Sequence, residues 1–286
     1  MKIYTLNKVQ LSFALLVAVI IFTSVFFLYN ENIFVKTSAK SGTSWGLGFH
    51  SQEKQPTAPM SADKLKEYNA FYVGNEKEQV IYLTFDAGYE NGYTTSILDT
   101  LKNNGVSAAF FLVGNYFETN PELVLRMAEE GHIVGNHTNK HLDMTKLTSI
   151  DEFKAQLTPI EEKYEEITGK KLQKFYRPPE GKFNTDNLAW AKECGYNTVF
   201  WSLSYVDWLQ NDVKTKDYAF EKLLPRLHNG CVLLLHSTSE TNEKMLDEFI
   251  KKCKSEGYTF RSLNELKAEN CKCGDECKDG CKCGCK

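Results

Sequence analysis

The sequence lacks both glycine-rich signatures that cradle nucleotide phosphates, GxxxxGK[ST] and GxGxxG, so it gives no support for a nucleotide cofactor. It also lacks a basic excess, because 34 Lys and Arg residues stand against 37 Asp and Glu residues, a formal net charge of −3. Nucleic-acid binding usually needs a basic face, so no nucleic-acid partner is expected. The remaining composition, 42% hydrophobic and 25% charged over 286 residues, predicts a sizeable globular core with room for appendages.

Charged side chains are absent from residues 9–28, and Lys2 and Lys8 precede that stretch. A helix of this length rises about 30 Å, the thickness of the hydrocarbon core of a bilayer. Basic residues before the stretch favour a cytoplasmic N-terminus and an exported remainder. We expect residues 1–30 to be an uncleaved signal anchor; a cleaved signal peptide and a buried core helix are the alternatives. Either membrane reading places the working domain outside the cytoplasm, anchored to the membrane or secreted to the cell wall.

Residues 31–78 are expected to be a linker and a short N-terminal extension, because residues 36–59 are rich in Ser, Thr, Gly, Lys and Gln. From residue 79 onward, strand and helix patterns alternate. Strands are expected at residues 80–85, 106–113, 132–135, 175–177, 197–202, 231–236 and 258–262. This alternation predicts parallel strands joined by helical crossovers, in an open sheet or a barrel. In both folds, chemistry gathers at the carboxyl ends of the strands.

Polar side chains follow these strands. Asp86 follows the first, in the sequence TFDAG, where a carboxylate is costly without a partner, although helix caps and turns also use Asp. His137 and His141 follow the third strand in HTNKH, and their spacing would place them on one helix face as ligands of one cation. A pair of surface histidines is the alternative.

Further candidates follow the later strands. Arg177, in RPPEG, could hold a carboxylate bidentately or be a solvated side chain on a rigid loop. His236 closes the sixth strand and taken alone would be a core histidine. With Asp207 as a partner it becomes a candidate general acid, because a carboxylate fixes the tautomer and raises the pKa of an imidazole. Together these residues supply the metal ligands and the acid–base groups that a metal-assisted hydrolase uses.

The five sequences TFDAG, HTNKH, RPPEG, Asp207-Trp208 and Leu234-Leu235-His236 occur in the order found in NodB-type polysaccharide deacetylases, carbohydrate esterase family 4. The chain resembles this family over about residues 79–266, and we assign the deacetylase domain to residues 79–268. The resemblance implies a distorted (β/α) barrel with about seven parallel strands. It also implies hydrolysis of N-acetyl groups on a polysaccharide, most simply a cell-wall glycan.

The resemblance further implies a role for each of nine residues. The implied assignments are Asp86 as general base, Arg177 as its orienting partner, His137 and His141 as metal ligands, His236 as general acid tuned by Asp207, Trp208 and Leu234 as the lining of the acetyl pocket, and Glu180 as the source of a backbone N–H for the oxyanion.

Ala87 departs from the family pattern, because the usual second Asp, a metal ligand, is replaced by a methyl group that cannot coordinate. The expected divalent metal, Zn, would therefore be held weakly. The departure is similar to that in the sporulation delta-lactam-biosynthetic deacetylases. This resemblance implies action on N-acetylmuramic acid of peptidoglycan without stem peptides, giving muramic δ-lactam in spore cortex around the forespore. A chitin-oligomer or xylan deacetylase and a non-catalytic wall-binding homologue are the alternatives.

Six of the nine cysteines fall in residues 269–286, with Lys, Gly, Asp and Glu between them, so no core can form there. The C-x-C spacing is typical of thiolate clusters that bind Zn or Cu(I). Disulfide linkage and crosslinking to other wall or coat proteins are the alternatives. The other three cysteines, Cys194, Cys231 and Cys253, are expected to be inert core thiols.

Overall fold

The computed structural model describes residues 42–270, so the predicted membrane segment and the cysteine-rich tail lie outside the described residues. Within residues 42–270, no helix combines the length and the apolar character that a bilayer crossing requires.

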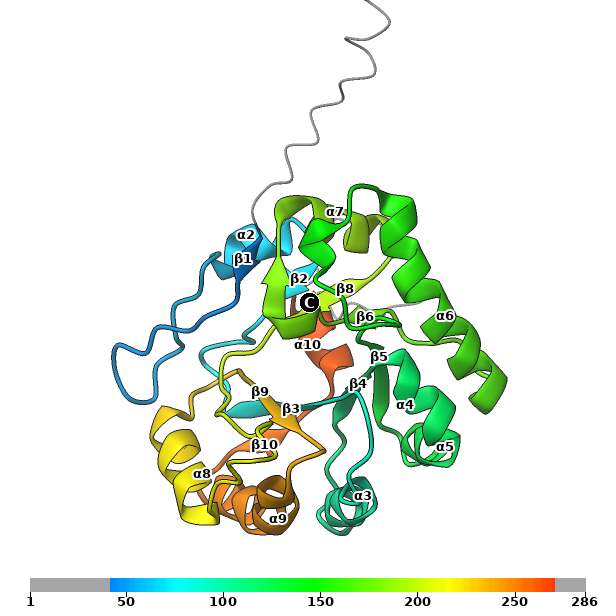
Figure 1. The fold of residues 1–286 in the computed structure, drawn as a ribbon. Helices are drawn as coiled ribbons and strands as arrows, with labels where there is room; N and C mark the ends of the chain where they lie inside the picture. The colour runs from blue at the N-terminus through cyan, green and yellow to red at the C-terminus, as the bar shows by residue number, and fades with distance from the viewer. Residues whose placement is uncertain (1–41, 271–286) are drawn as a thin grey trace, which may run out of the picture. The chain divides into compact units, whose positions relative to one another are not determined.

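A single parallel sheet forms the centre of the domain (Figure 1). Its strands lie in the order β10-β3-β4-β5-β6-β8-β2. Strand β9 lies off this path and pairs with β3 from Ile81 to Asp86. The bounds of the strands are β2 Ala70–Phe71, β3 Val80–Ala87, β4 Ala109–Leu112, β5 Ile133–Asn136, β6 Phe175–Tyr176, β8 Asn197–Val199, β9 Cys231–His236 and β10 Thr259–Phe260. All seven strands expected from the sequence are present and parallel, so the predicted architecture is confirmed. The short strand β2 was not predicted.

The helices between the strands lie outside the curved sheet in Figure 1, whereas α10, which follows the last strand, packs Leu263 and Leu266 into the apolar cluster that contains Val80 and Tyr82. The bounds of the helices are α2 Ala62–Lys66, α3 Thr94–Asn103, α4 Gly114–Thr119, α5 Pro121–Glu129, α6 Ile150–Thr168, α7 Thr185–Glu193, α8 Lys216–Leu223, α9 Glu240–Ser255 and α10 Leu263–Asn270, with 3-10 turns η1 Met144–Lys146, η2 Pro179–Gly181 and η3 Leu224–Arg226. Local chemistry sets the ends of the longest, α6. The Ser149 side chain caps its first turn, and Gly169, at φ 67°, ends it in the left-handed conformation.

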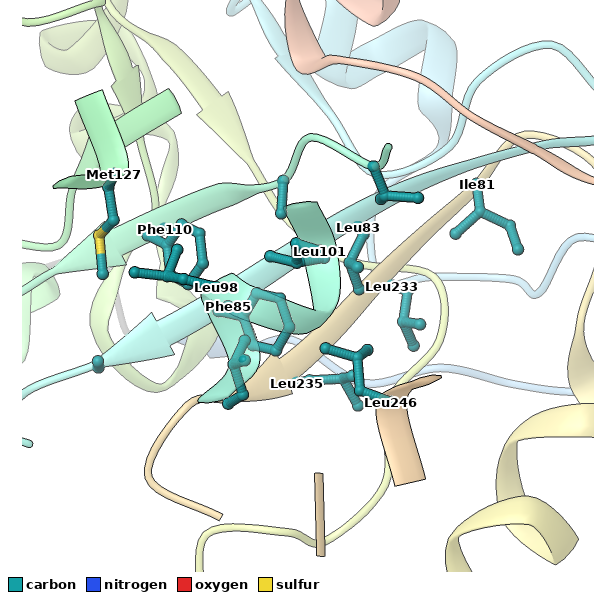
Figure 2. Packing of buried hydrophobic residues seen from close by; sticks show 14 of the residues in the cluster. Ile81, Leu83, Phe85, Leu98, Leu101, Phe110, Met127, Leu233, Leu235 and Leu246 are labelled. Atoms are coloured by element: carbon teal, nitrogen blue, oxygen red, sulfur yellow. The ribbon is translucent and has the colours of Figure 1, made fainter. Parts of the chain in front are cut away.

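Alternation of side chains along β3 divides the core. Ile81, Leu83 and Phe85 pack against residues of α3 and α9 (Figure 2), whereas Val80 and Tyr82 belong to a separate apolar cluster inside the sheet. Because alternate side chains of a strand share a face, Asp86 points to the same face of β3 as Val80 and Tyr82. The strand therefore turns the candidate base away from the helical layer.

Residues 42–59, the described part of the segment expected to be a linker, pack against the domain. Strand β1, Thr43–Ser44, pairs antiparallel with β7, Lys182–Phe183. Trp45 is buried, stacks on Phe200 with ring centroids 4.1 Å apart, and donates its indole N–H to the Trp201 carbonyl at 2.9 Å. The polar composition of residues 42–59 concealed this anchor, because one large aromatic side chain can fix a polar segment.

Candidate active site

The register of β3 and β9 sets Asp86 directly beside His236, just as it pairs Thr84 with Leu234 two rungs earlier. Both residues line one cleft of about 710 Å³ at the carboxyl ends of the strands. The other residues that line this cleft include Ala87, His137, His141, Glu180, Trp208 and Leu234. The structure thus brings together the candidates that the sequence placed at separate strand ends, as expected for parallel strands.

Arg177 fixes the candidate base. Its Nη1 lies 2.7 Å from Asp86 Oδ1, and its Nε donates to the Val199 carbonyl at 2.9 Å. The guanidinium is fully buried and lies over the Phe111 ring. Burial raises the pKa of Asp86, but the charge of Arg177 and the neighbouring histidines outweigh it, so the pKa of this carboxyl lies below its usual value. Asp86 is therefore an ionised acceptor whose Oδ1 is committed to Arg177.

His137 and His141 lie side by side, with ring centroids 4.9 Å apart. They do so on a loop, so the predicted shared helix face is wrong. The Thr138 N–H donates to the Asn136 side chain, and the His141 N–H donates to the Thr138 hydroxyl, so side chains take the backbone groups that a helix would pair. Thr138 and His141 accordingly have positive φ values of 71° and 52°.

The tautomer of His137 follows from its contacts. Its Nδ1 lies 2.8 Å from the Arg177 carbonyl, which can only accept, so Nδ1 carries the proton. Its Nε2 lone pair then faces Asp86 Oδ2, 3.6 Å away. Burial lowers the pKa of His137 to about 4, which keeps the ring neutral, and burial also lowers the pKa of His141. A neutral imidazole oriented by a carbonyl is the form in which His binds metals.

His236 is held by Asp207, as the sequence predicted. Its Nδ1 lies 2.7 Å from Asp207 Oδ1, and its backbone N–H donates to Oδ2 at 2.8 Å. Burial lowers the pKa of His236, but the Asp207 charge and hydrogen bond outweigh it and raise the pKa above its ordinary value. The imidazolium is therefore favoured, with Nε2–H as the proton not committed to Asp207.

Sequence reasoning missed two residues behind this pair. Asn242, in the first turn of α9, donates from Nδ2 to Asp207 Oδ2 at 2.6 Å and to the His236 carbonyl at 2.9 Å. The Tyr205 hydroxyl donates to Asn242 Oδ1 at 2.6 Å, so the amide orientation is fixed. No motif marks either residue, and only the packing of α9 on the strand ends reveals them.

The remaining candidates form the cleft walls. The centroids of the Trp208 and His236 rings lie 5.6 Å apart, and Leu234 is buried. Glu180 has a left-handed backbone, at φ 55°, and a side chain that is 57% exposed and paired with Lys182. The side chain is therefore largely exposed to solvent, and the residue lines the cleft.

The donor set limits any metal site. No group of three His, Cys, Asp or Glu side chains arranged to hold a cation occurs in residues 42–270. The Ala87 methyl offers no electron pair, and Arg177 occupies one oxygen of Asp86. His137 and His141 nevertheless fit a divalent cation, because both are kept neutral and lie together at the cleft. The site offers two imidazoles and leaves the other coordination positions to water or substrate.

Comparison with known proteins identifies relatives of this arrangement. The family described as Polysaccharide deacetylase matches residues 73–199. Peptidoglycan-N-acetylmuramic acid deacetylase PdaA of Bacillus subtilis is 43% identical over 227 residues, 79% of this chain and 86% of that protein. A peptidoglycan-N-acetylglucosamine deacetylase of Bacillus cereus is 34% identical over 206 residues, 71% of this chain and 73% of that protein.

A solved structure extends the likeness to the fold. The structure of Bacillus subtilis PdaA, described as a family 4 carbohydrate esterase, superposes with a TM-score of 0.75 at 41% identity. The match covers 79% of this chain and 97% of that one. The distorted (β/α) barrel expected from the sequence is thereby confirmed, and the chain belongs to the polysaccharide deacetylases, the NodB-type family 4 carbohydrate esterases.

Proposed function

We propose that the protein hydrolyses the N-acetyl amide of N-acetylmuramic acid in peptidoglycan, releasing acetate and leaving a free amine. The observation that carries this proposal is the register of β3 and β9, which sets an ionised carboxylate and a carboxylate-supported imidazole at one cleft. The relative PdaA is a peptidoglycan-N-acetylmuramic acid deacetylase, which supports the choice of sugar. Amide hydrolysis needs a base for water and an acid for the leaving nitrogen, and the cleft offers both.

Each half of the reaction has its own residues in this proposal. Asp86 Oδ2 accepts a proton from the attacking water, while Arg177 holds Oδ1 and fixes the carboxylate plane. His236 donates its Nε2 proton to the departing nitrogen, and Asp207 stabilises the charged ring beforehand. The Glu180 backbone N–H stabilises the oxyanion, and Trp208 and Leu234 enclose the acetyl methyl group.

We propose that His137 and His141 hold a divalent cation, most simply Zn. Deacetylases of this family are generally metal-dependent. A cation bound there would supply Lewis acidity toward the acetyl carbonyl. With two imidazoles and no carboxylate at position 87, the site exchanges its metal readily, so dialysis against a chelator removes it and added Zn²⁺ restores it.

Acetate release tests the function. Glycan strands with and without stem peptides are incubated with the wild-type protein and with Asp86→Asn, a variant of nearly identical shape. We expect wild-type release from strands without stem peptides and a loss of at least about 100-fold in the variant, because general-base contributions have this size. Equal, minimal release by both proteins would instead favour a non-catalytic wall-binding protein.

Three further proposals concern what surrounds the reaction. We propose that the freed amine closes to muramic δ-lactam during spore formation, which mass spectrometry of the incubated glycan would detect as the loss of water.

We propose that residues 1–30 anchor the protein and expose the deacetylase domain, residues 79–268, to the wall, where a protease added to intact cells would reach it. For the tail, residues 269–286, we propose thiolate metal binding, which a thiol titration with and without Zn²⁺ would reveal.

A further inference from the structure

The described part of the chain leaves six large apolar side chains exposed to solvent; all six lie on loops that follow the carboxyl ends of strands, and Tyr89 and Trp208 line the cleft. The six are Tyr89, Leu142, Val206, Trp208, Leu209 and Val213, between 37% and 54% exposed. Tyr89 lies on the loop after β3, Leu142 on the loop after β5, and the other four on the loop after β8. Scattered exposed apolar residues need no explanation, but their gathering at one end of a barrel indicates a binding surface.

The loop that carries Tyr89 is fixed although the Tyr89 ring is 44% exposed. The Glu90 carboxylate next to it accepts the backbone N–H groups of Gly92 at 2.7 Å and Thr94 at 3.1 Å. The same carboxylate accepts the Tyr116 hydroxyl at 2.8 Å. The ring is therefore presented to solvent by an ordered backbone, which reduces the entropy lost when a ligand covers it.

A second set of contacts joins this loop to the one after β8. Asn91 Nδ2 donates to Gln210 Oε1 at 2.9 Å and to the Thr238 carbonyl at 3.1 Å. Gln210 is two residues beyond Trp208, and both Trp208 and Tyr89 line the cleft. The two aromatic side chains thus belong to one connected rim beside the reacting groups.

The chemistry of the rim favours sugar rings. A pyranose presents C–H groups on its faces and hydroxyls at its edge, so an aromatic ring can cover a face while water keeps the hydroxyls solvated. Among the described residues that line the cleft, none is Lys or Arg. The cleft therefore offers flat apolar contact and no lysine or arginine side chain, which suits the ring faces of a polysaccharide better than an anionic peptide.

We propose that Tyr89, with Trp208 and Leu209 on the joined loop, is a stacking platform for the sugar residue next to the one that reacts. The protein would then take glycan strands of several residues and discriminate against single N-acetyl sugars. This inference rests on the proposed deacetylase function, because it assigns the platform to the same glycan. When the protein binds a sugar residue remote from the reacting bond, the binding energy helps to hold the acetyl group in place in the transition state.

Binding measurements on strands of defined length test the platform without turnover. Calorimetry would use the Asp86→Asn background with N-acetylmuramic acid alone and with strands of alternating N-acetylglucosamine and N-acetylmuramic acid, up to the hexasaccharide. We expect affinity to rise with length in that background. Adding Tyr89→Ala should lower hexasaccharide affinity about tenfold and leave the affinity for single N-acetylmuramic acid unchanged, because one aromatic contact with the neighbouring sugar is lost. Tyr89→Phe keeps the ring face and should match the background, whereas Asn91→Ala, which unlinks the loops, should lose part of the affinity.

Kinetics separate this inference from the function on which it rests. In otherwise wild-type protein, Tyr89→Ala should lower kcat/KM for the hexasaccharide about tenfold and leave that for single N-acetylmuramic acid unchanged. Equal hexasaccharide affinity and kinetics for Tyr89→Ala and the parent, with acetate still released, would overturn the platform and keep the function. A length-dependent affinity that Tyr89→Ala abolishes, without acetate release by the wild type, would keep the platform and refute the function. Matching thermal unfolding of Tyr89→Ala and Tyr89→Phe would show that the fold is intact.

Discussion

Asp207→Asn is the most informative change, because it replaces one oxygen by an amide at nearly constant size. Three N–H groups converge on the Asp207 carboxylate: His236 Nδ1, the His236 backbone and Asn242 Nδ2. An asparagine side chain there presents one oxygen and one donor, so at least one of these buried N–H groups faces another donor. An unpaired buried donor costs about 1–3 kcal/mol, which we expect as a loss of unfolding free energy in urea.

The same change acts on catalysis through protonation. The Asp207 charge is what raises the pKa of His236 against the effect of burial. Without it, burial alone lowers that pKa, so the ring is neutral over more of the neutral range. Because a general acid must be protonated, the alkaline limb of kcat/KM should move to lower pH, and activity above that limb should fall by about 100-fold or more.

The assay is acetate release across pH 5 to 9 on one glycan preparation, at a temperature where both proteins are folded. We expect the variant to recover much of its activity at the acidic end, where His236 is protonated in either protein. A variant profile parallel to that of the wild type, lowered equally at every pH, would refute the assignment of His236 as an acid tuned by Asp207. Asn242→Ala serves as a comparison, since it removes a partner of Asp207 but keeps the charge.

Three other predictions follow from the geometry. Ala87→Asp supplies the missing carboxylate and should tighten Zn²⁺ binding by at least about tenfold in chelator competition, since affinity rises with ligand number and charge; unchanged affinity would contradict the proposed site. Trp45→Ala should lower the free energy of unfolding by about 3–5 kcal/mol in urea and Trp45→Phe by clearly less, because the latter keeps a ring against Phe200; equal losses would argue against stacking. Burial lowers the pKa of His132 to about 4 from 6.5; the unfolded chain therefore binds more protons between these values, and urea midpoints should fall as pH drops from 6.5 to 4, less so in His132→Gln.

The parallel barrel could be predicted because its strands are short apolar runs between helices. The run of β3, for example, is buried on both faces, so its composition alone marks it. The gathering of Asp86 and His236 followed from the rule that parallel strands end at one edge. That rule locates side chains without requiring knowledge of the strand order.

Other features were hidden from the sequence for physical reasons. The histidine spacing of HTNKH fits a helix, but Asn136 and Thr138 divert the backbone through side-chain hydrogen bonds that spacing does not reveal. Asn242 matters only because α9 begins where β9 ends, a tertiary relation. Trp45 lay in a segment whose average composition resembled a linker, and one ring outweighed that average.

The reacting groups of this site are positioned by strand register, whereas its exposed aromatic side chains are positioned by loops. Asp86 and His236 form one rung of the sheet on neighbouring strands, where a slip of one residue in either strand would turn its side chain into the helical layer. Tyr89 and Trp208 are carried on connections that can change length without disturbing that ladder. Exchanging those loops among relatives should therefore change which polymer the enzyme accepts. The spacing between the proton acceptor Asp86 and the proton donor His236 should stay the same, so glycan preference can be altered without rebuilding the barrel.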